Sequence, residues 1–139
     1  MSEKALLREK HIEYVASLDE KTNDLEYWLS EHLRLNGVYW GLTALYLLDS
    51  METFKKEDVI DFVLKCRDRK SSGFAAFPGH DGHLLTTLSG LQILATYKAL
   101  DRLSNEDKNE IVRFILSNQK EDGSFQGDKF GEVDTRFVY

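Results

Sequence analysis

The sequence contains very little cysteine and no long apolar run. Cys66 is the only cysteine among the 139 residues, so an internal disulfide cannot form and zinc sites built from several cysteines are excluded. The longest apolar runs, such as 42–48, are far shorter than the roughly 20 residues that a transmembrane helix needs. The first ten residues have mixed charge and lack the apolar core of a signal peptide. We therefore expect a cytoplasmic protein that is not an integral membrane protein.

Basic residues are also scarce relative to acidic ones. The chain has 18 Lys and Arg residues against 24 Asp and Glu residues, which gives a formal net charge of −6. Nucleic-acid binding draws its affinity from clustered basic side chains, so we expect no nucleic-acid partner. With 42% hydrophobic and 30% charged residues, the composition is that of a folded globular domain or part of one.

Proline occurs once, at Pro78, which leaves long stretches free to form helices. Apolar residues recur at spacings of three and four almost throughout, and this pattern predicts an all-α fold. Asp24 and Asp81 stand where they could cap the second and fifth helices. The expected helices span 6–18, 25–33, 38–48, 57–66, 83–100 and 105–119.

Two kinds of helix alternate along the chain. Segments 38–48 and 83–100 are apolar around most of their circumference, which predicts burial by neighbours on several sides, whereas 57–66 and 105–119 have one apolar stripe. Glycine-rich loops follow at 71–82 and 121–131. This order predicts inner and outer helices that alternate in an internal repeat.

The repeat period is near fifty residues. Residues 42–48 align with 88–94, a shift of 46, and residues 60–64 align with 112–116, a shift of 52. We therefore expect residues 1–139 to form the amino-terminal part of a single α/α barrel (toroid) of helix-pair repeats. The repeats would span about 36–82 and 83–131, and a third would begin at 133. Since a third inner helix begins at Thr135 and then stops, we interpret the chain as a fragment.

Three motifs in this order resemble a known family. They are RLNGVYWGLTAL at 34–45, GHDGHLLT at 79–86, and EDGSFQGD at 121–128 followed by FGEVDTRF at 130–137. Together they resemble the β subunits of Rab geranylgeranyltransferase, also called protein geranylgeranyltransferase type II. The resemblance covers about the whole chain.

This resemblance implies an α/α barrel that pairs with an α subunit. The enzyme would transfer geranylgeranyl from geranylgeranyl diphosphate to carboxyl-terminal cysteines of Rab GTPases delivered by Rab escort protein. In the family a zinc ion binds the acceptor sulfur and favours its thiolate. The family's zinc ligands, an Asp and a Cys two residues apart and a later His, would follow Tyr139. We therefore assign no catalytic or metal-binding residue, expect no zinc to bind these 139 residues, and expect them to be inactive alone.

The resemblance also carries over four positions of the substrate cavity. Asn36 matches a position where this family has a small residue and farnesyltransferases have a bulky tryptophan, so the cavity would be longer here. Trp40 lies one turn further along the same helix. Arg136 matches an arginine near the acceptor-peptide site, and Tyr139 matches an aromatic residue of the lipid cavity.

Several other interpretations of the same residues remain open. His80, Asp81 and His83 could bind a metal. The alternative is that Asp81 caps the helix that begins near His83. Residues 122–133 imitate a calcium loop, but position twelve is Val133 rather than glutamate. Arg136 and Asp134 could form a simple ion pair, and Cys66 is expected to pack rather than react.

Other functions are also open. A non-catalytic helical-repeat binding module would have the same pattern of alternating helices. The same pattern is also expected of other α/α barrel proteins, namely the β subunit of a farnesyltransferase or of a type I geranylgeranyltransferase, or a terpene cyclase.

Overall fold

The computed structural model describes residues 6–21 and 23–138. These residues fold into six α-helices linked by short 3-10 turns, and within the described ranges β-structure is limited to isolated bridges. The predicted all-α fold is therefore confirmed. The helices are α1 (Arg8–Glu20), α2 (Leu25–Leu29), α3 (Arg34–Leu47), α4 (Lys56–Lys65), α5 (Leu84–Thr96) and α6 (Asn105–Ser117), and the 3-10 turns are η1 (Glu31–Leu33), η2 (Met51–Thr53), η3 (Leu100–Arg102) and η4 (Thr135–Val138).

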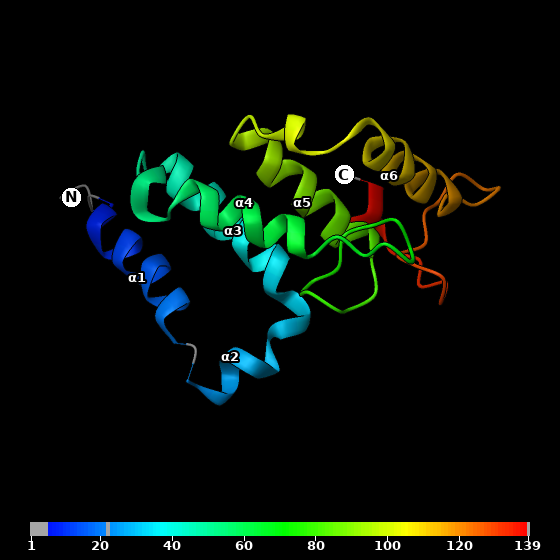
Figure 1. Ribbon diagram of the computed structural model, residues 1–139. Coiled ribbons are helices and arrows are strands. Elements are labelled where there is room, and N and C mark those ends of the chain that lie inside the picture. Colours follow the sequence, from blue (N-terminus) through cyan, green and yellow to red (C-terminus); the bar gives the residue numbers. More distant parts are fainter. Residues whose placement is uncertain (1–5, 22, 139) are drawn as a thin grey trace.

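Helices α3 and α5 lie side by side and share the most extensive packing between any two elements (Figure 1). Helix α4 packs on α5, and α6 runs along the outer side of the same unit. The larger core cluster joins these layers through buried apolar side chains, which include Leu35, Leu42, Ile60, Val63, Phe74, Ile93, Leu94 and Ile111. A smaller cluster of Leu84, Phe114 and Phe137 joins α5, α6 and η4. Burial of this apolar surface is the main force that holds the layers together.

The expectation that α3 is buried on several sides holds for only part of its surface. Its buried residues are Leu35, Leu42 and Leu45. Trp40 is 57% exposed and Leu47 is 78% exposed. Helix α3 packs against α5 and α1, and the described residues provide no cover for its remaining side. The apolar circumference of α3 therefore divides into a core face and an uncovered face.

The two glycine loops have the same backbone pattern. Bridges join Arg67 to Phe74 and Ala75 to Gly82 in the first loop, and Gln119 to Phe125 and Gln126 to Val133 in the second. The second set is displaced from the first by 51 or 52 residues. The loops are thus structural equivalents, one in each helix pair.

Each inner helix begins with a hydrogen bond to one of these loops. The amide of Leu35 donates to the carbonyl of Ala76 over 3.0 Å, and the amide of Leu84 donates to the carbonyl of Gly127 over 2.7 Å. The first four amides of a helix have no partner within it, so these loops satisfy one of them in each repeat. The loops therefore fix where each inner helix starts.

Gly127 is required by close packing. A Cβ atom at this position would collide with the imidazole of His83. The same imidazole lies edge-to-face against Phe137, with the ring centroids 5.3 Å apart. The second loop can approach the start of α5 because residue 127 has no side chain.

The predicted caps of two helices differ from the structure. His83 occupies the cap position of α5, and its Nδ1 accepts a hydrogen bond from the amide of Leu85 over 3.1 Å. Asp81 lies two residues too early, and it pairs instead with Lys129 at 3.3 Å. Asp24 stands at the start of α2, but its side chain makes no capping hydrogen bond.

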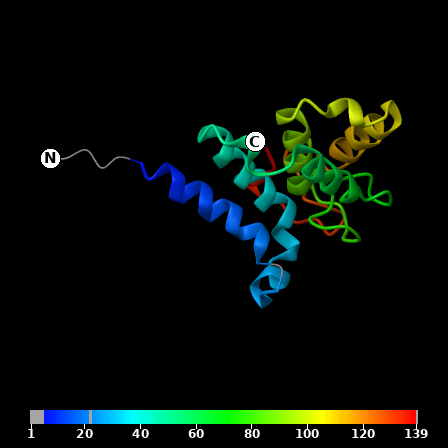
Figure 2. The ribbon, with the colours of Figure 1, turned by 60° about the vertical axis from the view of Figure 1, so that its left-hand side comes forward.

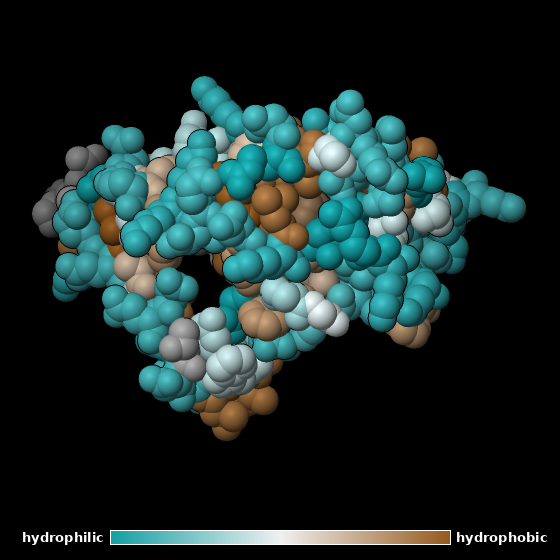
Figure 3. Space-filling view, viewed as in Figure 1, coloured by the Kyte–Doolittle hydropathy of each residue, from teal (hydrophilic) through white to brown (hydrophobic). Residues whose placement is uncertain are grey.

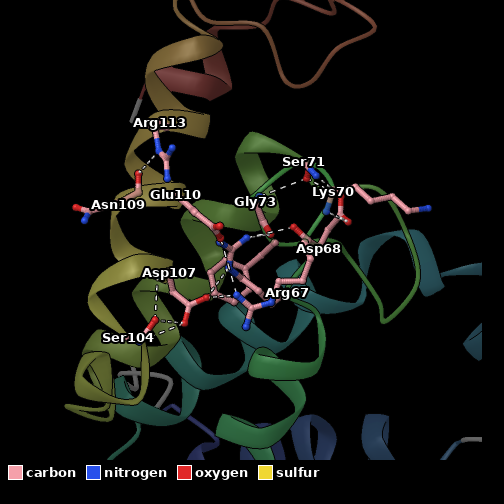
Figure 4. A network of polar contacts seen from close by, with 12 residues as sticks. Arg67, Asp68, Lys70, Ser71, Gly73, Ser104, Asp107, Asn109, Glu110 and Arg113 are labelled. Carbon is pink, nitrogen blue, oxygen red and sulfur yellow. Dashed lines mark hydrogen bonds and ion pairs between the residues drawn. The ribbon is translucent and has the colours of Figure 1, made fainter.

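A largely buried arginine connects the two outer helices (Figure 4). The side chain of Arg67, which follows α4, is only 4% exposed, and its Nη2 lies 2.9 Å from Oε2 of Glu110 on α6. Its Nη1 donates to the carbonyl of Gly73 over 2.9 Å. The carboxylate of Asp107 accepts a hydrogen bond from Arg69 and another from the hydroxyl of Ser104. The same hydroxyl accepts from the amide of Asp107, and this reciprocal pair caps α6. A buried guanidinium is tolerated because Glu110 and Asp107 neutralise its charge and its two terminal nitrogens are hydrogen-bonded, although Nε has no hydrogen-bond partner among the described residues.

No helix within residues 6–21 and 23–138 is long and apolar enough to cross a membrane.

Replacing Leu94 with alanine tests the packing between the inner helices. Leu94 lies on α5 and is fully buried, so Leu94→Ala should lower the free energy of unfolding by about 2–5 kcal/mol through lost burial and a residual cavity. Urea unfolding of both proteins measures the difference. Leu116→Ala on α6 is the matched control, because Leu116 is 61% exposed and its loss should change stability by less than about 0.5 kcal/mol. Equal effects of the two variants would contradict this packing.

Candidate functional site

The uncovered face of α3 forms a stripe with one polar residue. Asn36, Trp40 and Leu47 are separated by four and seven residues, so they lie on one side of the helix. The neighbouring helix α5 adds Leu85 and Leu88, which are both partly exposed. We call these five residues the inner wall. It presents mainly apolar surface, and one amide lies near its end.

Asn36 is held against the neighbouring helix. Its Oδ1 accepts a hydrogen bond from Oγ of Ser89 over 2.9 Å. Ser89 lies on α5 and is 4% exposed. The amide of Asn36 is therefore directed toward α5 at the junction of the two inner helices.

Trp40 supplies the largest apolar surface of the inner wall. Its ring packs against Tyr39 at a centroid separation of 5.0 Å and a tilt of 56°, yet the residue remains 57% exposed. A tryptophan that is exposed to this extent on an inner helix is available for an apolar ligand or for further parts of a longer fold.

Arg136 lies in η4, which packs against α5. Its Nε lies 2.8 Å from Oδ1 of Asp134, and its Nη2 lies 3.5 Å from Oε1 of Glu132. The hydrogen bond from Arg136 lowers the pKa of Asp134 below its usual value. The ion-pair interpretation of Arg136 is therefore confirmed, and its role near an acceptor peptide stays a prediction. Tyr139 lies outside the described residues.

Asn36 and Arg136 nevertheless occupy equivalent positions. Leu35 and Leu84 make the same hydrogen bond to their glycine loops, which aligns Asn36 with Leu85. The inner helices are therefore displaced by 49 residues, and the predicted shift of 46 is wrong; the positive φ angles of Asp49 and Lys98, just after the two helices, have the same spacing of 49. The amide of Leu85 donates to the side chain of His83, and the amide of Arg136 donates to that of Asp134 over 2.8 Å. Asn36 on α3, Leu85 on α5 and Arg136 in η4 thus stand at equivalent positions of the repeat. Within the described residues, the third inner helix predicted from Thr135 is a 3-10 turn, Thr135–Val138.

The structure does not bring His80, Asp81 and His83 together. Nε2 of His80 lies 2.7 Å from Glu31, while Asp81 pairs with Lys129 and His83 caps α5. In the second glycine loop, Oδ1 of Asp122 accepts from the amide and hydroxyl of Ser124 at 3.0 and 2.6 Å. Gly123 has φ +85° there, which is the geometry of a glycine turn.

The described residues do not fit a catalytic zinc. Within residues 6–21 and 23–138, no group of three His, Cys, Asp or Glu side chains converges on a point that could hold a metal ion. Cys66 is buried in the main core cluster, and burial raises the pKa of its thiol to about 12. The thiol is therefore protonated near neutral pH. The prediction that Cys66 packs is confirmed.

Sequence reasoning missed two features. One is Ser89, because nothing in the sequence distinguished its hydroxyl from those of the threonines on the same helix. The other is a cleft of about 600 Å³ between the α1–α2 segment and helices α3 and α4, visible as an opening in Figure 3. Helix α1 lies beside α3, as Figure 2 also shows. The lining of the cleft includes Gly37 and Gly41, and this pair of small residues four apart was the available signal. The guanidinium of Arg34 lies over the Tyr27 ring in this cleft, 3.4 Å from its centroid.

Comparisons with known proteins agree on one family. Residues 6–139 match the model of the prenyltransferase alpha-alpha toroid domain. The chain is 68% identical over 134 residues to a geranylgeranyl transferase type-2 subunit beta from Saccharomyces cerevisiae, covering 96% of this chain and 41% of that protein. It is 48% identical over 147 residues to the same subunit from Candida albicans, covering 99% and 43%.

A different prenyltransferase subunit is less similar. Over 102 residues the chain is 28% identical to a protein farnesyltransferase subunit beta from Pisum sativum, covering 73% of this chain and 24% of that protein. In all three comparisons the chain spans less than half the length of the relative, about two fifths for the two type-2 subunits.

The cap of α5 predicts a pH dependence of stability. Burial lowers the pKa of His83 below its ordinary value, and Arg136 lowers it further, while Asp128 and Glu132 oppose this shift. The unfolded chain therefore binds the proton more readily than the folded one. The stabilisation is complete above about pH 6.5, the ordinary pKa of histidine, and is lost as the pH falls toward the lower folded value.

His83→Asn tests this dependence, because asparagine caps a helix and does not titrate. Chemical unfolding at pH 7.5 and pH 5 should show a smaller loss of stability on acidification in the variant than in the wild type. His11→Gln, which removes an exposed imidazole from α1, serves as the control and should keep the wild-type slope. An unchanged slope in His83→Asn would contradict the role of His83.

Proposed function

The chain belongs to the prenyltransferase alpha-alpha toroid family, and on that premise we propose that it is part of the β subunit of a protein geranylgeranyltransferase type II. The observation that carries this proposal is the identity of 68% to a geranylgeranyl transferase type-2 subunit beta over 96% of the chain. The identity of 28% to a farnesyltransferase subunit beta supports the type-2 class over the farnesyl class.

The proposed reaction joins an isoprenoid to a protein thiol. The complete enzyme, paired with an α subunit, would transfer geranylgeranyl from geranylgeranyl diphosphate to carboxyl-terminal cysteines of Rab GTPases delivered by Rab escort protein. A carbon–sulfur bond forms, the bond from the isoprenoid carbon to the diphosphate oxygen breaks, and the thiol loses its proton. We place this reaction in the cytoplasm, in keeping with a buried, reduced Cys66.

The inner wall is the part of this chain that we assign to the lipid. Trp40, Leu47 and Leu88 offer apolar surface that the described residues leave partly or largely exposed. An isoprenoid chain that covers such surface gains about 0.8 kcal/mol for each buried methylene. Asn36 is much smaller than tryptophan, which leaves length for a twenty-carbon chain. Arg136 would lie near the acceptor peptide, and Tyr139 would contribute to the lipid cavity.

Zinc belongs to this proposal only through the longer protein. The described residues do not fit the ion, and we propose that its ligands lie in the part of the relatives' length that this chain does not span. The contribution of this chain is to bind and orient the lipid.

The direct test is prenyl transfer by the longer protein that contains this sequence. It would be purified with its α subunit and given tritiated geranylgeranyl diphosphate, a Rab GTPase and Rab escort protein. We expect label on the Rab carboxyl terminus and none on a Rab whose terminal cysteines are replaced by serine. Absence of transfer with the wild-type Rab would refute the proposed function and favour a non-catalytic binding module.

Asn36→Trp tests the assignment of the inner wall to the lipid. The larger side chain should shorten the cavity and lower the preference for geranylgeranyl over farnesyl diphosphate, measured as the ratio of kcat/KM values, by about tenfold or more. Tyr46→Trp is the matched control, because it places tryptophan on an exposed position of α3 that lies off the stripe. A ratio unchanged in Asn36→Trp would place the lipid elsewhere.

A further inference from the structure

Ser89 makes an unusual use of its hydroxyl. Serine and threonine within helices commonly donate to the carbonyl four residues earlier in the same helix. Thr43 on α3 donates in this way to Tyr39, and Thr96 on α5 donates to Gln92, both over 2.8 Å. Ser89 instead donates across the helix junction to Oδ1 of Asn36 over 2.9 Å. The hydroxyl therefore links two inner helices rather than two turns of one helix.

The environment of Ser89 makes this bond specific. Ser89 is 4% exposed, so water competes little for its hydroxyl, and a hydrogen bond between buried partners is costly to break. Asn36 is only partly buried. Ser89 is therefore the fixed partner, and the hydrogen bond determines the orientation of the Asn36 side chain.

The orientation of the Asn36 side chain determines whether a polar group lies beside Trp40 on the inner wall. With Oδ1 bound to Ser89, the amide lies toward α5 and leaves the adjacent surface free. Without that partner, the amide can take other rotamers, and some of these extend over the face of α3 that also carries Trp40. Such rotamers place a polar group where an apolar chain would lie, and desolvating that group opposes binding.

We propose that Ser89 is a positioning residue that holds Asn36 clear of the lipid cavity and thereby maintains selectivity for the longer isoprenoid. The inference rests on the proposed function, since it concerns the lipid that the inner wall accepts. It adds a residue that does not itself contact the lipid, and it identifies the Ser89–Asn36 hydrogen bond as the interaction that directs the amide of Asn36 toward α5.

The test compares lipid selectivity in the longer protein purified with its α subunit. The ratio of kcat/KM for geranylgeranyl over farnesyl diphosphate is measured for the wild type, Ser89→Ala and Asn36→Leu. Each variant removes one partner of the hydrogen bond, and leucine is close to asparagine in size. We expect Ser89→Ala to lower the ratio by about fivefold, the effect of one typical hydrogen bond. Asn36→Leu has no amide to misplace and should keep a ratio near that of the wild type, and adding Ser89→Ala to it should lower the ratio no further, because Ser89 acts only through the amide.

Matched controls separate positioning from general destabilisation. Thr96→Val removes a hydroxyl from the same helix that bonds only within that helix, and it should leave the ratio unchanged. Ser89→Thr keeps the hydroxyl and should retain most of the selectivity. Thermal melting of each complex verifies that the variants are folded.

The outcomes are distinct. A lowered ratio in Ser89→Ala that disappears in the Asn36→Leu background supports the inference. Equal losses of kcat/KM for both lipids, with an unchanged ratio, would overturn it and leave Ser89 a merely structural residue. If the wild-type complex transferred neither lipid, the proposed function would fail, and this inference would fall with it.

Discussion

The hydrogen bond from the first turn of each inner helix to a glycine loop is the constraint on which the remaining structure depends. Leu35 donates to Ala76 and Leu84 donates to Gly127, so a loop that follows each outer helix defines where its inner helix begins. The loop can approach because residue 127 has no side chain to meet His83. Since the same bond recurs, α3 and α5 begin at the same point relative to their own glycine loops.

The outer layer is held by a different kind of interaction. Arg67 follows α4 and pairs with Glu110 on α6, and it also binds the first glycine loop through the carbonyl of Gly73. One buried cation thus connects two outer helices and a loop. Breaking a buried ion pair leaves an uncompensated charge, so these three parts are expected to keep one relative arrangement. Helix α4 packs on one side of α5, and Leu85 and Leu88 of α5 form part of the inner wall.

The repeated loop contacts place residues of different chemistry at equivalent positions. Asn36 on α3, Leu85 on α5 and Arg136 in the 3-10 turn η4 are polar, apolar and cationic in turn. Under the proposed function, the apolar surface of the inner wall would contact the lipid, and Arg136 would lie near the acceptor peptide. The exposed surface of Trp40 and Leu47 provides the apolar part.

The sequence by itself determined the all-α fold and the family. The helix predicted at 25–33 divides into α2 and η1 in the structure, and the one predicted at 83–100 ends at Thr96. Apolar spacing depends on local periodicity, and the three motifs are contiguous segments, so both can be read without coordinates. Only the tertiary structure decided which side of α3 is covered, that His83 rather than Asp81 caps α5, and that Ser89 reaches Asn36 from 53 residues away. The reason is physical. A side chain's partner depends on which groups the packed helices bring within about 3 Å, and no local pattern encodes a distance between segments remote in sequence.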